Sequence, residues 1–308
     1  MFDLVGIGNP VYDIIITPFS RTNGRVLSGC STNACLASKK LGLKKVGLVG
    51  AIGLDYKKRF LDDMRNYGIE VSVDATCKET GGFHLIYDAT GNRTLDVLGQ
   101  AGKITSKNFP EEFLQSRFFI IGPILGEVDL TLIEFLRSST SGKLFLDPQG
   151  LIRLIGPDGR IVHSCNSDEF KQITSLVDFL KPNQHESETI THEKDPLLAL
   201  QRLSSMGARV PVITLAERGS LMLEGGRLSR IPPYATHAVD PTGAGDVYAG
   251  SFITELERGS NLVEAALYAS AAASIMVEQV GPDFQLPQGK VEERRNAIRD
   301  QLVTETIV

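Results

Sequence analysis

The sequence contains no tryptophan, and only 7% of its 308 residues are aromatic. A binding site built from many stacked rings is therefore disfavoured, although Phe and Tyr can still supply one or two. Lys and Arg form no run longer than three residues, and the net charge is −5. A nucleic-acid-binding surface is not expected from this charge distribution.

Long apolar segments are also missing. The apolar residues 4–16 are interrupted by Asn9, Pro10 and Asp13, so we expect neither a signal peptide nor a membrane span. The cysteines show no CxxC pair and no histidine at metal-binding spacing; they are Cys30, Cys35, Cys77 and Cys165. Scattered thiols of this kind are typical of a protein of the reducing cytoplasm.

Two common phosphate-binding motifs are not present either. The stretch "GIGNPV" at 6–11 has the first two glycines of a dinucleotide fingerprint, but Val11 stands where the third glycine is needed. No "GxxxxGK[ST]" sequence occurs anywhere in the chain. Dinucleotide-dependent oxidoreductases and P-loop NTPases are therefore disfavoured.

The chain instead alternates apolar runs with helical patterns. Strands are predicted at 3–8, 45–53, 118–124, 144–147, 176–182 and 210–217, and helices at 31–42, 55–68 and 246–258. This order predicts an α/β fold of three layers, with a mostly parallel sheet flanked by helices on both faces. We expect one domain over residues 1–308.

One segment departs from this alternation. Residues 81–100 alternate polar and apolar side chains around a "DATGNR" turn, which predicts an antiparallel hairpin. A second extended piece, 11–19, is expected to pair with it. We predict a small β lid over a crevice, formed by residues near 11–28 and 79–101, the alternative being a hairpin without a role.

The stretch "VDPTGAGDVYAG" at 239–250 carries the strongest chemical signal. Gly243, Ala244 and Gly245 allow the backbone to turn tightly, and their amides would begin a helix that favours a bound anion. A carboxylate beside a phosphate site repels the phosphate, so the presence of Asp246 calls for a functional explanation. Removal of a hydroxyl proton during phosphoryl transfer is one; an acidic N-cap is the alternative.

With this motif, four others resemble the ribokinase-like (PfkB) family of small-molecule kinases, in the order found in that family. They are "GNPVYD" (8–13), "SGCSTNACLASKKLG" (28–42), "KPNQHE" (181–186) and "ITLAERG" (213–219). The likeness covers nearly the whole chain. It implies a ribokinase-like fold and transfer of a phosphate to a hydroxyl of a small molecule.

The resemblance also implies roles for individual residues. Asp246 would be the catalytic base and residues 243–245 the anion hole. Substrate would contact Asp13, Gly29, Asn33, Gln149 and Arg153, and nucleotide would contact Asn183, Thr214, Gly219 and Thr242. Glu186 would hold Mg²⁺ through water, and the donor would be ATP, with ADP and a monovalent cation left open.

Some of these residues also have simpler interpretations. Asn33 could be a helix N-cap, Asp13 an exposed strand residue, and Asn183 and Glu186 solvated surface near a helix start. The sequence departs from the family at Ser28 and Ala216, where glycine is usual. These departures bear on the flexibility of the lid hinge and on nucleotide placement.

The substrate is less sharply indicated. "FLDPQGLIR" (145–153) and "IGPILGE" (121–127) resemble the myo-inositol kinase branch, which favours an inositol-like polyol or sugar. A nucleoside, a sugar phosphate that meets Asn92 and Arg93, and a non-catalytic metabolite binder are the alternatives. A homodimer through the lid face that carries Phe83, Leu85 and Tyr87 is also predicted.

Overall fold

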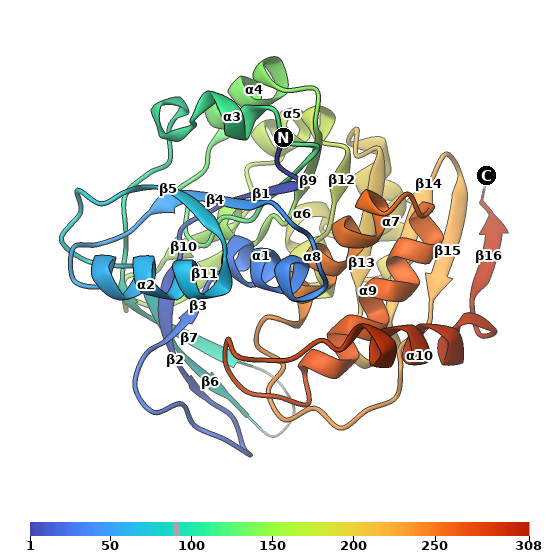
Figure 1. Ribbon diagram of the computed structural model, residues 1–308. Helices are drawn as coiled ribbons and strands as arrows, with labels where there is room; N and C mark the ends of the chain where they lie inside the picture. Colours follow the sequence, from blue (N-terminus) through green and yellow to red (C-terminus); the bar gives the residue numbers. More distant parts are fainter. Residues whose placement is uncertain (89–92, 308) are drawn as a thin grey trace.

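The computed structural model describes residues 1–88 and 93–307, and its centre is a ten-stranded sheet (Figure 1). Seven neighbouring strands run parallel: β5 (Glu70–Asp74), β4 (Val46–Ala51), β1 (Leu4–Ile7), β8 (Phe118–Ile121), β9 (Lys143–Leu146), β12 (Phe179–Leu180) and β13 (Val210–Thr214). Antiparallel strands β14 (Ser220–Glu224), β15 (Arg227–Ile231) and β16 (Val303–Thr306) complete the sheet. The fold class predicted from the alternating pattern is confirmed.

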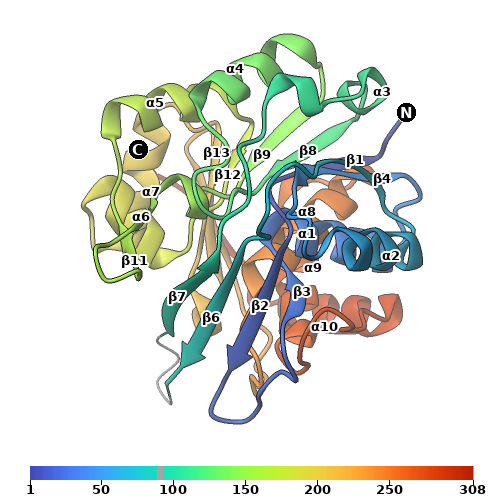
Figure 2. The ribbon, with the colours of Figure 1, turned by 90° about the vertical axis from the view of Figure 1, so that its left-hand side faces the viewer.

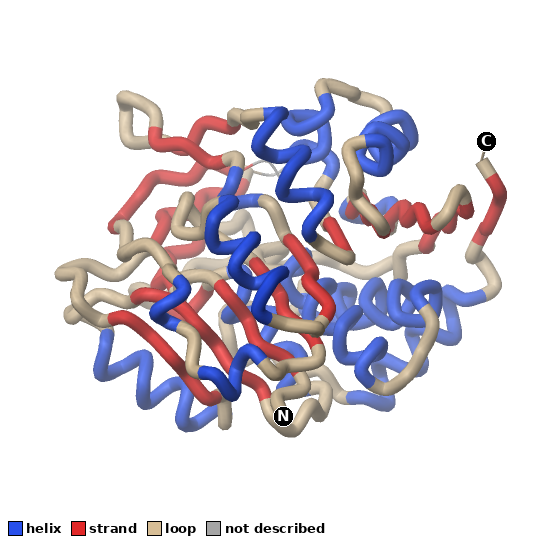
Figure 3. Tube along the Cα trace, turned by 90° about the horizontal axis from the view of Figure 1, so that it is seen from above, coloured by secondary structure: helices blue, strands red, loops and turns tan. Residues whose placement is uncertain are grey.

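Helices cover both faces of this sheet, which explains why its central strands are continuous apolar runs (Figures 2 and 3). One buried cluster joins the sheet to α1 (Cys30–Lys40), α2 (Lys57–Tyr67), α8 (Ala244–Glu257), α9 (Leu262–Met276) and α10 (Gln288–Arg299). The other joins it to α3 (Glu111–Leu114), α4 (Leu130–Ser139), α5 (Ser167–Leu176), α6 (Gln184–Thr191) and α7 (Pro196–Ser205). Neighbouring strand residues alternate between the clusters: Leu4 belongs to the first and Val5 to the second.

Two predicted strands are shorter than expected. The segment 176–182 contributes only β12, because α5 extends to Leu176 and packs Phe170 and Ile173 into the core. Strand β13 ends at Thr214, and a short 3-10 helix over Ala216–Arg218 follows it. Both differences arise at element ends, where helix and strand patterns overlap.

Close packing of α1 on α8 places two functional segments side by side. A side chain at Gly250 would meet the Ala34 carbonyl oxygen at 2.3 Å, so only glycine permits this approach. Ser38 Oγ donates to the Gly250 carbonyl at 3.0 Å and fixes the same crossing. The start of α1 is thereby held against the start of α8.

A second sheet of four strands lies apart from the first (Figure 2). It consists of β3 (Val26–Ser28), β2 (Val11–Ile16), β6 (Gly82–Tyr87) and β7 (Arg93–Gly99), in that order. Strands β6 and β7 form the predicted antiparallel hairpin, and β2 pairs with β6 in parallel. We call these four strands the small sheet. The turn at 89–92, with Asn92, lies outside the described residues.

The prediction of an exposed apolar face at Phe83, Leu85 and Tyr87 was wrong. These side chains are buried against Ile124 and Leu125, which come from the loop after β8. Alternation along a strand gives two faces but does not tell which one is covered. The outer face carries Ile86, which is 38% exposed, with the half-buried Ile14 and Ile16.

A short hairpin lies beside the small sheet. Its strands are β10 (Arg153–Ile155) and β11 (Ile161–His163), and Arg160 bridges to Asp96 on β7. The hairpin, which follows β9 in the chain, therefore contacts the β7 edge of the small sheet. In the part of the chain that the structure describes, no helix combines the length and apolar character needed to cross a membrane.

Candidate active site

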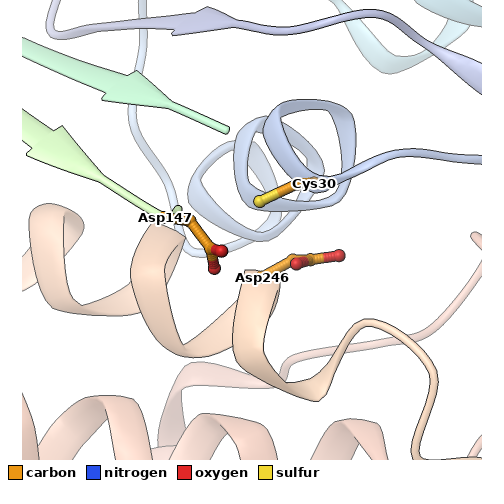
Figure 4. Close-up of side chains that lie close together, drawn as sticks. All are labelled: Cys30, Asp147 and Asp246. Carbon is orange, nitrogen blue, oxygen red and sulfur yellow. The ribbon is translucent and has the colours of Figure 1, made fainter. Parts of the chain in front are cut away.

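The predicted site residues gather at the carboxyl ends of the parallel strands. Asp147 directly follows β9, Lys181 directly follows β12, and Asp246 lies in the first turn of α8. Figure 4 shows Asp147 and Asp246 close to Cys30 at the start of α1. This edge of the sheet is where open α/β folds bind their ligands.

Helix α8 begins with the predicted small residues. Gly243 is its N-cap and has a φ of 83°, a left-handed conformation that favours glycine. Ala244 and Gly245 occupy the first turn, so the amides of 243–245 lie at the positive end of the helix dipole. Asp246 is therefore not the N-cap, and the capping interpretation is wrong.

The Asp246 side chain is held by two neutral donors. Its Oδ2 accepts from Asn33 Nδ2 at 2.9 Å, and its Oδ1 accepts from Gln149 Nε2 at 3.4 Å. The residue remains partly exposed, so a ligand can reach it. Burial of the carboxyl and then the nearby Asp147 raise the pKa of Asp246 above its usual range. An elevated pKa suits a group that takes a proton.

A buried ion pair underlies this site and was missed in the sequence. Lys181 Nζ lies 2.8 Å from Asp147 Oδ2, and both side chains are 3% exposed. Burial lowers the pKa of Lys181, but the carboxylates of Asp147 and Glu186 outweigh it and keep the ammonium charged. A side chain on Gly245 would approach Lys181 Nζ to 3.2 Å. The charge therefore lies directly behind the start of α8.

Cys30 joins this group as a neutral thiol. Its Sγ and single carboxylate oxygens of Asp147 and Asp246 all lie within 4.8 Å of one another (Figure 4). Burial, and secondly those two carboxylates, raises the pKa of Cys30 well above its usual value. The cysteine has no motif of its own, and only its position next to Gly29 in the second motif pointed to the site.

Asp13 is buried rather than exposed on its strand, which contradicts the simpler interpretation. Its Oδ1 accepts from the Phe83 amide at 2.7 Å and thereby ties β2 to β6. Burial raises the pKa of Asp13 to about 6, and the Phe83 amide, the Ser28 hydroxyl and nearby arginines partly oppose this shift. The Ser28 that replaces the usual glycine thus supports the Asp13 carboxylate.

The structure also brings Gln149 and Arg153 to the site. Arg153 Nη2 donates to Gln149 Oε1 at 2.5 Å, and Gln149 in turn reaches Asp246. Arg153 Nη1 donates to the Ile124 carbonyl at 3.3 Å, while its buried Nε has no partner among the described residues. Arg153 is only 5% exposed.

The second motif is placed at the start of α1. Gly29 is the N-cap of this helix, with a φ of 114°, and Asn33 lies within the first turns. Asn33 is thus not a helix cap; its side-chain amide points to Asp246 instead. The interpretation of Asn33 as an N-cap is wrong.

Asn183 and Glu186 form a capping box at the start of α6. Asn183 Oδ1 accepts from the Glu186 amide, and Glu186 Oε2 accepts from the Asn183 amide, each at 2.9 Å. Glu186 is 4% exposed, so it is not solvated surface. Burial and then Asp147 raise the pKa of Glu186, while Lys181 lowers it.

The remaining predicted residues lie around the same edge. Thr214 ends β13 and bridges to Asn183, and Gly219 follows the short turn that begins at Ala216. Thr242 is buried, and its hydroxyl donates to Tyr87 Oη of the small sheet at 3.0 Å. Thr242 therefore connects the loop at 240–243 before α8, called the α8 loop below, to the small sheet.

The fold and this set of residues define an α/β kinase for small molecules. Residues 20–289 match the model of the pfkB family carbohydrate kinases, and the chain belongs to that family. It is 32% identical to a cytidine kinase of Thermococcus kodakarensis over 86% of this chain and 92% of that protein. It is 27% identical to an inositol 3-kinase of Arabidopsis thaliana over 89% of this chain and 75% of that protein.

A solved structure shows the same fold at lower identity. A pyrophosphate-dependent kinase of the ribokinase family, complexed with a pyrophosphate analog and myo-inositol, superposes with a TM-score of 0.81. The match covers 94% of this chain and 99% of that one at 20% identity. The protein is a sugar or nucleoside kinase of the ribokinase family that acts on a small-molecule substrate.

Proposed function

We propose that the protein transfers the terminal phosphate of ATP to a hydroxyl of a small polyol or sugar, with an inositol-like acceptor favoured. The observation that carries this proposal is the placement of Asp246. Its carboxylate is partly exposed, has an elevated pKa and lies beside the amides of 243–245. This arrangement joins a proton acceptor to an anion site.

In the proposed reaction the acceptor hydroxyl gives its proton to Asp246 while its oxygen bonds to the terminal phosphorus. The bond from that phosphorus to the bridging oxygen breaks, and ADP leaves with that oxygen. The amides of 243–245, with Lys181 behind them, stabilise the negative charge on the transferred group. Asn33 and Gln149 keep the base oriented.

The donor is proposed to lie along α6 and the end of β13. Asn183, Thr214, Gly219 and Thr242 are assigned to nucleotide contact. The residues fit Mg²⁺, because Glu186 is a buried carboxylate with only one oxygen used by the capping box. When bound, the ion would neutralise phosphate charge near Glu186.

A monovalent cation also fits the residues present. Asp240 is 0% exposed, and its Oδ2 has no partner within the described part of the chain. Its Oδ1 accepts from the Thr242 amide at 2.9 Å, next to the proposed anion hole at 243–245. A cation held at Oδ2 would fix that loop.

The acceptor is proposed to contact Asp13, Gly29, Asn33, Gln149 and Arg153. Asp13 offers a carboxylate that accepts hydrogen bonds and Gln149 an amide that donates and accepts them, which suits a ring with several hydroxyls. The inositol 3-kinase relative supports this class. A nucleoside is the second candidate, supported by the cytidine kinase relative at higher identity.

We further propose that the small sheet acts as a lid and as a dimer interface. Its inner face meets the α8 loop through the Tyr87–Thr242 hydrogen bond. Its outer face presents Ile14, Ile16 and Ile86, which a second copy of the chain would cover.

The test is a phosphoryl-transfer assay on the purified protein. Myo-inositol, ribose, cytidine and fructose 6-phosphate are each incubated with Mg²⁺ and ATP, ADP or pyrophosphate, and phosphorylated product is measured by mass spectrometry. Rapid ATP-dependent phosphorylation of myo-inositol or ribose is expected. Preferential phosphorylation of cytidine would favour the nucleoside alternative, and no product from any pair would refute the proposal.

A further inference from the structure

Glu127 is a buried acid to which the proposed reaction gives no role. It ends the loop at 122–127 that follows β8, which we call the β8 loop, and it is 5% exposed. Its Oε1 accepts from the Asn9 amide at 2.9 Å and from the Ile124 amide at 2.8 Å. Its Oε2 accepts from the Leu125 amide at 2.7 Å. Among the described residues, the partners of this carboxylate are backbone amides and not cations, so its charge fixes the path of the β8 loop.

Only a carboxylate satisfies all three amides. Glutamine has the same size but offers one acceptor oxygen and an NH₂ group that only donates. In Glu127→Gln, the NH₂ group would face either the Leu125 amide or the amides of Asn9 and Ile124. At least one buried N–H would then lose its acceptor, which is costly, and the loop should shift to relieve it.

The β8 loop packs directly on the turn at 149–153. A side chain at Gly150 would come within 2.3 Å of the β8 loop backbone, so the two segments are in close contact. The Gly126 amide donates to the Gly150 carbonyl at 2.9 Å. Arg153 Nη1 donates to the Ile124 carbonyl at 3.3 Å. The position of the turn therefore depends on the position of the loop.

This turn carries two of the proposed acceptor contacts. Gln149 accepts from Arg153 Nη2 at 2.5 Å and donates to Asp246 at 3.4 Å. Asn183 and Thr214, which are assigned to the donor, bridge to each other at the start of α6 and the end of β13. A shift of the β8 loop should therefore disturb the acceptor side of the site and spare the donor side.

We propose that Glu127 is a positioning residue for the acceptor: its carboxylate shapes the β8 loop, and the loop holds Gln149 and Arg153 in the orientation in which they meet the acceptor. This inference rests on the proposed function. In this role Glu127 contacts neither reactant and gives or takes no proton. Because the two side chains are ordered beforehand, acceptor binding loses less conformational freedom.

The experiment compares Glu127→Gln with Asp129→Ala, a control two residues further along. Asp129 caps α4 by accepting from the Leu132 amide at 3.0 Å, so its loss lowers stability without changing the contacts of Glu127. Steady-state kinetics are measured with the acceptor that the transfer assay identifies. In Glu127→Gln the acceptor KM should rise about tenfold, with kcat and donor KM within about threefold of wild type. Asp129→Ala should match wild type in all three.

A double-variant cycle tests whether the effect passes through the turn. In an Arg153→Lys background, Glu127→Gln should raise the acceptor KM by less than about threefold, because the side chain that it positions is already altered. A full tenfold rise in that background would overturn the proposal. Unchanged kinetics in Glu127→Gln, or equal increases in donor and acceptor KM, would overturn it as well.

A second measurement does not need the acceptor. Hydrogen–deuterium exchange is followed in peptides that span 122–127 and 149–153, in wild type and both variants. Exchange in both peptides should be about tenfold faster in Glu127→Gln and unchanged in Asp129→Ala. Wild-type exchange at 149–153 in Glu127→Gln overturns the positioning role, even if no acceptor is phosphorylated. If Glu127→Gln does not fold, Glu127→Asp, which keeps the charge at a shorter reach, takes its place with the same outcomes.

Discussion

Replacement of Lys181 by methionine should destabilise the protein strongly, because Lys181 is the buried counter-charge of the site. The 2.8 Å pair with Asp147 is 3% exposed on each side. Removal of one partner leaves Asp147 as an uncompensated buried charge, which costs about 3–5 kcal/mol. For 308 residues the entropy of unfolding is about 0.65 kcal/mol/K, so Tm should fall by about 5–8 °C.

The loss should come from the unpaired charge rather than from lost packing, because methionine fills much of the volume of the lysine side chain. The double variant Lys181→Met, Asp147→Asn removes both charges and should recover most of the stability.

Urea unfolding followed by circular dichroism at pH 8 measures these differences. Lys143→Met is the matched control, because Lys143 forms a 3.0 Å pair with Asp178 but is itself 52% exposed. The control should lose no more than about 1 kcal/mol. If Lys181→Met loses as little as Lys143→Met at pH 8, the buried pair does not hold the site together.

Three further results are expected. Asp13 has a folded-state pKa of about 6, above its ordinary 3.8, so wild type should lose about 2 kcal/mol of stability as pH rises from 4 to 7. Asp13→Asn should abolish that loss in urea unfolding and raise acceptor KM, and an unchanged pH profile would refute the assignment. Ala216 has a φ of 52°, so Ala216→Gly should raise unfolding free energy by up to about 1 kcal/mol; a decrease would show that this backbone is not strained. Light scattering at micromolar concentration should give a dimer for wild type and a monomer for Ile86→Lys, and a monomeric wild type would remove the proposed interface.

The architecture was predictable because its signals are local. Each central strand is an apolar run between turn residues, and the alternation along 81–100 identified the hairpin of the small sheet. The covered face of that sheet was not predictable. Phe83 and Leu85 are buried by Ile124 and Leu125, which lie about forty residues further along the chain.

The site was predictable only where a motif marked it. Asp246 and Asn33 belong to such motifs, and the structure brings them within 2.9 Å. Cys30, Asp147 and Lys181 lie within quoted stretches but were given no role there, because their partners are set by the sheet order. The rule that ligands bind at the carboxyl ends of parallel strands could have found Asp147 and Lys181, once the strand ends were known.

Turnover of Asp246→Asn tests the central claim most directly. Asparagine keeps the size of the side chain and can still contact Asn33 and Gln149, but it cannot accept the proton. With the acceptor from the transfer assay, kcat should fall by about 10²–10⁴-fold. ATP affinity should stay near or slightly above that of wild type, because a charge that repels the phosphates is gone. Near-wild-type kcat in Asp246→Asn would contradict its role as the catalytic base.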